Sequence, residues 1–273
     1  MFGLRKAFSI LLIFLFIFSC SSPDKALVDP PKPKVELSKL YTYAMDDFKN
    51  NRPEPAIDKF KMIEKDYSYT EWAPKSVLMI AYIYYETSRC PDAYFAIDRY
   101  IKYYPNNPER VYAEYLKGMC YFEEVSEFSK DQEKTLQAIK QFNFLIKTYP
   151  NTEYAEDAKF KLDLLNDLLA GKEMYVARYY MNQRKWAAAL NRLKTIVDKY
   201  QTTIYIEEAL YRIVEIYHKL GLDEDANKAA SILGYNFNSS EWYKKSYLLV
   251  STSQTVLPKK DRSLLDSFKK VFN

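Results

Sequence analysis

Glycine and histidine are both scarce in this sequence for its length. The chain has 273 residues, of which 5 are glycine and 1, His218, is histidine. Phosphate-binding loops and tight strand hairpins depend on glycine, so the composition argues against a nucleotide-binding sheet protein. A single histidine leaves little basis for acid–base or triad chemistry. Because the sequence also has no phosphate loop, nucleophile elbow or paired metal-ligand spacing, we expect a protein that is not an enzyme and binds no metal.

An excess of charge of one sign is missing as well. The chain has 40 Lys and Arg against 36 Asp and Glu, a net charge of +4. Nucleic-acid-binding proteins gather basic residues on one face, so we expect no nucleic-acid partner. The acidic runs Glu207-Glu208 and Asp223-Glu224-Asp225 fall at predicted helix starts. Carboxylates complement the helix dipole there, and we expect both runs to be solvated.

Long apolar segments are absent except at the N-terminus. Ala7–Phe18 is an almost unbroken apolar run that follows Arg5 and Lys6. Basic residues, a short apolar stretch and then small residues are typical of a secretory signal peptide, and the apolar run is too short to span a bilayer comfortably. We therefore assign residues 1–19 to a signal peptide.

The signal ends in Ile17-Phe18-Ser19-Cys20, a segment that resembles the lipobox of bacterial lipoproteins. The resemblance implies cleavage before Cys20 and covalent attachment of a diacylglycerol and a fatty acyl chain, with no other cofactor. Several acyl chains give durable membrane anchoring. Ser21, rather than Asp, follows the cysteine, which in bacterial lipoproteins implies sorting to the outer membrane, on its periplasmic face. The alternative is an uncleaved membrane anchor with an incidental cysteine.

Cysteine is scarce beyond this site. Residues 20–35 comprise the lipidated cysteine and a polar, proline-rich tether, after which only Cys90 and Cys120 remain. The periplasm permits a disulfide between these two, but their spacing matches no disulfide framework, and we expect free thiols. Neither has a companion at metal-ligand spacing, which excludes a zinc site.

Aromatic residues, in contrast, are abundant, at 16% of the chain with 26 tyrosines, and they recur at a fixed distance from alanine. An aromatic residue stands eleven positions after each of five alanines, in the pairs Ala56/Tyr67, Ala93/Tyr104, Ala138/Tyr149, Ala189/Tyr200 and Ala226/Phe237. A small residue precedes each pair, at Ala44, Ala81, Gly118, Ala177 and Val214. Two helix axes approach closely only where the side chain at the crossing is small. The pattern resembles the tetratricopeptide repeat and predicts an all-α, superhelical solenoid of five such helix–turn–helix repeats over residues 36–250.

Three segments depart from the plain repeat. Residues Glu123–Thr135 are a polar insertion that we expect to be a surface loop, and Thr152–Gln183 is predicted to be one long helix. Residues 251–273 form a C-terminal tail with a predicted short amphipathic helix, whose apolar residues are Leu264, Leu265, Phe268 and Phe272. For this tail we favour capping of the last repeat over docking on a partner or a lipid surface.

The C-terminal half resembles one family more narrowly. The matching segments are Lys172–Tyr180, Trp186–Arg192, Tyr200–Thr203, Glu207–Tyr211 and Leu233–Phe237. With the lipobox, the tether and the repeats, they resemble the BamD family, lipoproteins of the β-barrel assembly machinery. The resemblance implies an essential, non-enzymatic scaffold. Such a scaffold docks on the BamA-type barrel subunit, belongs with other assembly lipoproteins and receives unfolded outer-membrane protein clients.

The resemblance also indicates where the barrel subunit binds. An arginine on the second helix of the fourth repeat is tied to that contact in the family, and Arg192 occupies the matching place. Arg178, on the preceding predicted helix, is the second candidate for a partner contact. The alternative for both residues is a solvated charge on a helix face.

The groove side of the first helix in each repeat follows from helical spacing. In the first three repeats these positions are largely aromatic: Tyr41, Phe48, Tyr82, Tyr85, Tyr112, Tyr115 and Phe122, with Met45, Leu78 and Met119. In the last two they are mixed: Met174, Arg178, Met181, Tyr211, Glu215 and His218. Unfolded outer-membrane strands alternate apolar residues, and tyrosine offers them a flat face and a hydroxyl, so we interpret the aromatic set as a client groove. The alternative is that these aromatics pack between repeats.

A second function class stays open. Solenoids of this kind also coordinate cell-wall synthesis or division in the periplasm by binding a peptidoglycan enzyme. Those coordinators usually carry a coiled coil ahead of the repeats, and no sustained heptads occur before Leu40. We therefore favour the assembly scaffold over the coordinator.

Overall fold

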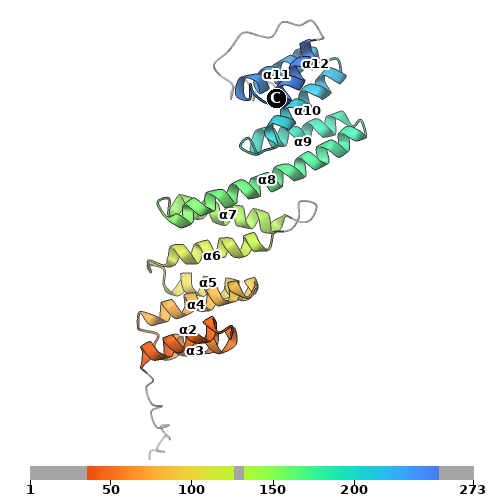
Figure 1. The fold of residues 1–273 in the computed structure, drawn as a ribbon. Coiled ribbons are helices and arrows are strands. Elements are labelled where there is room, and N and C mark those ends of the chain that lie inside the picture. The colour runs from red at the N-terminus through yellow and green to blue at the C-terminus, as the bar shows by residue number, and fades with distance from the viewer. Residues whose placement is uncertain (1–35, 126–131, 252–273) are drawn as a thin grey trace, which may run out of the picture.

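The computed structural model describes residues 36–125 and 132–251, and these residues form eleven α-helices and no strand. The helices are α2 (Leu37–Lys49), α3 (Pro53–Asp66), α4 (Trp72–Glu86), α5 (Cys90–Tyr103), α6 (Arg110–Glu123), α7 (Glu133–Thr148), α8 (Glu153–Asn182), α9 (Trp186–Lys199), α10 (Ile206–Lys219), α11 (Asp223–Asn236) and α12 (Glu241–Ser251). Consecutive helices pair as hairpins from α2/α3 to α10/α11, and the hairpins stack in chain order from one end of the molecule to the other (Figure 1). The predicted fold class, an all-α solenoid of five helical hairpins, is confirmed.

The alanine and aromatic markers occupy equivalent places in every hairpin. Each marker alanine lies in the second helix of its pair with an exposed fraction of at most 1%. Each marker aromatic is the residue at which that helix ends: Tyr67, Tyr104, Tyr149, Tyr200 and Phe237. The repeat period read from the sequence is therefore the period of the helix pairs.

The third hairpin shows why a small residue is needed where helices cross. A Cβ atom added to Gly118 would lie 2.5 Å from Cε1 of Phe142, which is itself fully buried. Real Cβ contacts are longer than this, so α6 and α7 approach at their observed distance only because position 118 has no side chain.

The turns inside the hairpins share a feature that sequence analysis missed. Asn51, Ser88, Arg184 and Gly221 have φ between 57° and 72°, and each stands five positions before a marker alanine. In every case the next residue donates its N–H to a carbonyl five positions back, as Arg52 does to Asp47 at 2.9 Å. This hydrogen bond belongs to the Schellman motif, which ends a helix with one left-handed residue. Because only one of the four residues is glycine, composition gave no sign of the motif.

The predicted long helix is α8, which the hydroxyl of Thr152 caps by accepting a hydrogen bond from Ala155 N. The predicted surface loop over residues 123–135 was wrong at both ends. Glu123 is the last residue of α6, and Glu133–Thr135 begin α7, with Thr135 buried. Residues 126–131 lie outside the described part of the chain.

α8 contributes to two hydrophobic core clusters. Its first half packs with α6 and α7 around Phe142 and Leu165, and its second half packs with α9 to α12 around Met174 and Ile213. At the C-terminal end, α12 lies against α10 and α11 and buries Val250. The predicted capping helix of the tail lies outside the described residues, and in the described part α12 covers the last hairpin. Within the described ranges no helix is both long enough and apolar enough to cross a bilayer.

Candidate functional site

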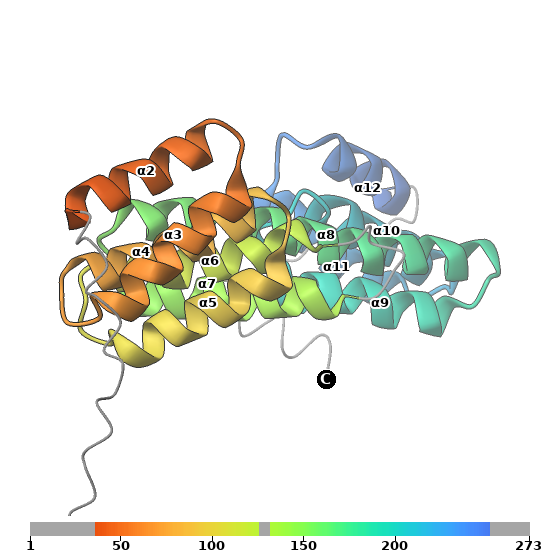
Figure 2. The same cartoon turned by 90° about the horizontal axis from the view of Figure 1, so that it is seen from below.

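The first helices of successive hairpins lie along one side of the solenoid. α2 contacts α4, α4 contacts α6, and α6 contacts α8. Viewed along the stack, α2 and α12 lie on one side and α5 and α9 on the other (Figure 2). Side chains that project from the first helices on this side therefore form a surface that continues from one repeat to the next.

The predicted groove aromatics of the first three repeats form most of this surface. Phe48 contacts Tyr82 with ring centroids 5.8 Å apart, across α2 and α4. Tyr112 and Tyr115 of α6 lie 5.6 and 5.1 Å from Tyr154 of α8. Tyr154 was missed by sequence analysis because α8 begins before the fourth repeat proper. We call Phe48, Tyr82, Tyr85, Tyr112, Tyr115 and Tyr154 the aromatic face.

The two outermost predicted groove residues pack differently. Tyr41 contacts Phe60 and Trp72 at centroid distances of 5.2 and 4.9 Å, and Phe122 contacts Phe142 at 6.4 Å. Both are half-buried against neighbouring helices. Tyr41 and Phe122 therefore pack between helices and are not part of the aromatic face.

The hydroxyl groups of the aromatic face are held neutral by their surroundings. Burial raises the pKa of Tyr85 to about 12, with the carboxylates of Glu123 and Glu86 adding to the rise. Burial also raises the pKa of Tyr115, and its hydroxyl donates a hydrogen bond of 2.7 Å to Asp157 Oδ2. All six side chains of the aromatic face are partly buried. Burial limits their motion, and the exposed part of each ring remains available as a flat apolar surface.

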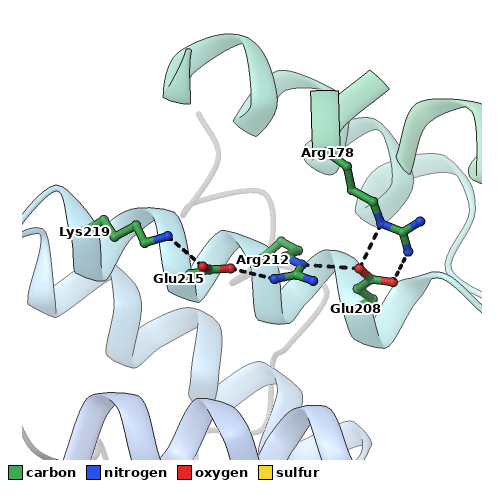
Figure 3. Close-up of polar contacts among 5 residues, drawn as sticks. All are labelled: Arg178, Glu208, Arg212, Glu215 and Lys219. Carbon is green, nitrogen blue, oxygen red and sulfur yellow. Dashed lines mark hydrogen bonds and ion pairs between the residues drawn. The ribbon is translucent and has the colours of Figure 1, made fainter. Parts of the chain in front are cut away.

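The inner side of the last two repeats carries charge instead. Arg178 of α8 donates from Nε to Glu208 Oε1 at 3.1 Å and pairs with the second carboxylate oxygen as well (Figure 3). Along α10, Arg212 donates to Glu208 Oε1 at 3.3 Å and to Glu215 Oε2 at 2.9 Å. Lys219 then donates to Glu215 Oε1 at 2.7 Å. We call these five residues, in alternating sign, the charged ladder.

The carboxylates of the ladder are more buried than its cations. The side chains of Glu208 and Glu215 are 10% and 18% exposed, whereas that of Arg178 is 49% exposed. Burial alone would raise the pKa of Glu215, but hydrogen bonds from Lys219 and Arg212 outweigh burial and lower it. The expectation that Glu208 is a solvated helix cap is therefore wrong. It is a buried acceptor that orients two arginines.

A pocket of about 270 Å³ lies beside the charged ladder. Its lining combines ladder cations with two apolar side chains, and it comprises Arg178, Met181, Asn182, Trp186, Arg212, Glu215 and Lys219. Lys219 Nζ lies 5.5 Å from the ring centre of Trp186. The guanidinium of Arg178 has five N–H donors, of which Glu208 takes two, so a carboxylate or carbonyl of a partner has donors to bind.

Three other predicted positions have a clear place in the structure. Met174 was expected in the groove but is fully buried in the core of α8 to α12, because its side of α8 faces α9. Leu78 is likewise a core residue. Arg192, on α9, has a side chain that is 46% exposed and donates a hydrogen bond of 3.2 Å to Glu173 Oε2.

No group of three or more His, Cys, Asp or Glu side chains suited to hold a metal ion occurs in residues 36–125 and 132–251.

The profile of the YfiO family, described as outer membrane lipoprotein, matches residues 33–232. The outer membrane protein assembly factor BamD of Caulobacter vibrioides is 39% identical over 242 residues, which is 88% of this chain and 78% of that protein. This chain belongs to the BamD family. The BamD of Rickettsia prowazekii is 35% identical and covers 92% of this chain and 99% of its own length. That of Neisseria meningitidis serogroup B is 33% identical, over 77% and 83%. The expected family is confirmed.

The BamD family match includes both inner surfaces. It runs from before α2 into α11, and so contains the whole aromatic face and the whole charged ladder, while α12 lies beyond it. The two surfaces thus lie within the part of the chain that the family profile matches.

Proposed function

We propose that this chain is a non-enzymatic outer-membrane lipoprotein scaffold of the β-barrel assembly machinery. It docks on a BamA-type barrel subunit, together with other assembly lipoproteins, and receives unfolded outer-membrane proteins for insertion. The observation that carries the proposal is the 39% identity across 88% of the chain to a protein named outer membrane protein assembly factor. A solenoid suits this role because its stacked repeats present one long surface to an extended partner.

The aromatic face is the proposed client surface. Unfolded outer-membrane strands alternate apolar and polar residues and carry many aromatics. Six aromatic rings along α2, α4, α6 and α8 offer such a strand repeated flat contacts, and tyrosine hydroxyls offer hydrogen bonds to its backbone. The rings are already held by Phe48–Tyr82 and Tyr115–Asp157 contacts, so little side-chain freedom remains to be lost on binding.

A peptide titration tests the client surface. The variant Tyr82→Ala, Tyr85→Ala, Tyr115→Ala is compared with the wild type for binding a labelled peptide from the last strand of an outer-membrane barrel. We expect the dissociation constant to rise at least about tenfold, since an aromatic anchor in such an interface is worth roughly 2 kcal/mol.

The matched control removes three strongly exposed aromatics elsewhere: Tyr69→Ala, Phe95→Ala and Tyr103→Ala, whose side chains are at least 64% exposed. This control should bind as the wild type does. Unchanged affinity in a folded Tyr82, Tyr85, Tyr115 triple variant would end the client hypothesis. If that variant unfolds, Tyr82→Phe and Tyr85→Phe, which keep the rings, should retain most of the affinity.

The barrel subunit is proposed to contact the fourth repeat through Arg192 and Arg178. Both guanidinium groups are about half exposed while their carboxylate partners are mostly buried. A partner carboxylate can therefore join each pair without displacing a buried group.

Affinity purification from detergent-solubilised membranes tests the docking. We expect the wild-type chain to recover a BamA-type barrel protein. The variant Arg192→Glu should recover much less of it, because the new carboxylate repels both Glu173 and the proposed carboxylate of the partner. Lys199→Glu, an exposed change of the same kind on α9, is the control and should recover it normally. Recovery of a peptidoglycan synthase in place of the barrel protein would favour the coordinator alternative. The names of the relatives do not favour that alternative.

Attachment to the periplasmic face of the outer membrane through a diacylglycerol and a fatty acyl chain on Cys20 is also part of the proposal. Cys20 lies outside the described residues, and the support comes from the family description as an outer membrane lipoprotein. Mass spectrometry of the mature N-terminus should find an acylated Cys20 as the first residue. The variant Cys20→Ser should lack the acyl mass and be washed from the membrane fraction.

A further inference from the structure

Two thiols are buried at the junction between the second and third repeats. Cys90 is the first residue of α5, and Cys120 lies in the last turn of α6. Their side chains are 5% and 0% exposed and belong to one hydrophobic cluster. Glu123 and Glu124 stand three and four residues after Cys120, and so on its side of α6, and they line a pocket together with Cys90. Apart from Cys20, these are the cysteines of the chain.

The helices that carry the thiols are clamped together. Tyr94 of α5 donates a hydrogen bond of 2.7 Å to Glu124 Oε2 and stacks on Tyr121 with ring centroids 4.7 Å apart. Farther along the same pair of helices, Lys117 donates to Asp98 Oδ1 at 2.7 Å. These contacts hold the start of α5, which carries Cys90, against the end of α6, which carries Cys120. An approach of the two side chains there would form an S–S bond of about 2.05 Å.

One of the two thiols has an approach from solvent. Cys90 borders a pocket of about 380 Å³ whose other lining residues are Tyr85, Glu86, Ser88, Glu123 and Glu124. Cys120 does not line this pocket and is fully buried. A reagent that enters the pocket therefore meets Cys90 first, with Cys120 behind it.

We propose that Cys90 and Cys120 form a reversible disulfide that joins the second repeat to the third, with Cys90 as the attacking thiol and Cys120 as the resolving thiol. The inference rests on the proposed periplasmic position only for the supply of oxidant, because disulfides form and persist in that compartment. The oxidant is a small disulfide or the active-site disulfide of a thiol oxidase.

The chemistry balances as two exchange steps. Cys90 loses its proton and attacks one sulfur of the oxidant, which forms a mixed disulfide and releases one oxidant thiol. Cys120 then loses its proton and attacks Cys90 Sγ, which forms the protein disulfide and releases the second oxidant thiol. Two cysteine thiols are oxidised by two electrons in total, and the oxidant disulfide is reduced to two thiols that take up the two protons.

The surroundings make the first step slow and pH-dependent. Burial raises the pKa of Cys90, Glu124 and Glu123 add to the rise, and Lys134 opposes it. Burial also raises the pKa of Cys120. The thiolate is the reactive form, so the rate of oxidation should increase with pH across the neutral and mildly alkaline range.

The disulfide would act on the aromatic face. Tyr85 belongs to that face and lines the same pocket as Cys90, and Tyr112 and Tyr115 project from α6, the helix of Cys120. A covalent link between α5 and α6 would hold this part of the aromatic face in one geometry. The second and third repeats could then no longer move relative to each other as they can when both thiols are reduced.

A redox titration of the purified full-length protein tests the proposal. The protein is equilibrated with glutathione buffers of increasing oxidised fraction, quenched with acid, alkylated with N-ethylmaleimide, and digested for mass spectrometry. We expect a cross-linked peptide pair containing Cys90 and Cys120, whose fraction rises with the oxidised fraction. We also expect the melting temperature of the oxidised form to exceed that of the reduced form by about 5–10 °C.

Single variants test the order of the two thiols. Cys120→Ala should accumulate a glutathione adduct on Cys90, because nothing resolves it, whereas Cys90→Ala should leave Cys120 unmodified. Neither variant should form the cross-link or change its melting temperature with oxidation.

Three outcomes would overturn the proposal: both thiols alkylated in full after denaturation at every buffer ratio, a cross-link in which Cys90 pairs with another cysteine, or an adduct on Cys120 in place of Cys90. If the variants do not fold, the wild-type titration still decides. Because the assay supplies a defined oxidant to purified protein, its failure leaves the proposed assembly role untouched. Failure of the barrel purification likewise leaves the thiol result standing.

Discussion

The inner side of the first three repeats and that of the last two are built from different chemistry on the same scaffold. In the first, aromatic rings touch from helix to helix, as Phe48 does Tyr82 and Tyr115 does Tyr154. In the second, Arg178 and Glu208 join α8 to α10 through a paired hydrogen bond. Aromatic contact depends on area and tolerates many apolar partners, whereas an ordered row of charges accepts partners of complementary charge. One solenoid therefore presents a permissive surface and a selective one.

Close helix approach, in contrast, is common to both halves. An added Cβ atom would meet the ring of Phe142 at Gly118 in the first half and the ring of Tyr243 at Gly234 in the second. Ion pairs between helices also occur in both halves, as in Lys117–Asp98 and Arg178–Glu208. Enlarging a small side chain should therefore harm either half, and the two halves differ in the aromatic face and the charged ladder.

The largest effect is expected from Gly118→Ala. The added methyl group would lie 2.5 Å from the buried ring of Phe142, so α6 and α7 must separate. We expect the free energy of unfolding to fall by about 2–3 kcal/mol, measured by denaturant titration. Adding Phe142→Leu to the same chain should recover part of the loss, because it removes the ring that the methyl group meets. A neutral Gly118→Ala would contradict the close-approach argument.

Removing the central carboxylate of the charged ladder should cost less. Glu208→Gln leaves Arg178 and Arg212 without their shared negative partner, and we expect a loss of about 1–2 kcal/mol that shrinks at high salt. Glu173→Gln, which breaks one partly exposed pair with Arg192, is the matched comparison and should cost about 0.5 kcal/mol. Both are measured by denaturant titration at low and high salt. Equal effects of the two substitutions would contradict the claim that Glu208 contributes more to stability than Glu173.

Alkaline pH should separate the two halves. The folded pKa of Tyr85 is raised to about 12, above the value near 10 of an unfolded tyrosine. Its contribution to stability is therefore complete below pH 10 and is lost as the pH rises toward 12. Fluorescence of single-tryptophan variants reports each half, with Trp72 kept for the first and Trp186 for the second. The Trp72 signal should change at the lower pH. Coincident transitions would mean that the halves unfold as one unit.

The smallest effects are expected at the hairpin turns, which both halves share. Gly221→Ala places a side chain at φ of 72° and should cost about 1 kcal/mol. Ser88→Gly removes a side chain from φ of 57° and should gain a few tenths of a kcal/mol or nothing, since glycine also loosens the unfolded chain. Thermal unfolding measures both, and a stabilising Gly221→Ala would contradict the left-handed assignment of this turn.

The periodic part of the fold was predictable because each repeat must bury the same positions. A marker alanine such as Ala93 is small because two helices cross there, and Tyr104 stands where the helix must end. These constraints act within one repeat, so the same residue types recur in the sequence at a fixed spacing. Two wrong predictions concern how the helices pack. Met174 was placed by helical spacing, and spacing does not say which neighbouring helix covers a given side. Glu208 was placed by its position at a helix start, which does not reveal the arginine of α8 that it pairs with.

The sequence by itself determined that the chain is a stack of five helical hairpins, that it resembles an outer-membrane assembly lipoprotein, and that its two halves differ in aromatic and charged content. Only the tertiary structure decided that Glu208 is a buried acceptor between two arginines, that Tyr154 extends the aromatic face, and that Cys90 and Cys120 are buried in one cluster. The physical reason is one of range. Helix periodicity is recorded along the chain within a few turns, whereas the partners of a side chain thirty residues away depend on how neighbouring hairpins stack.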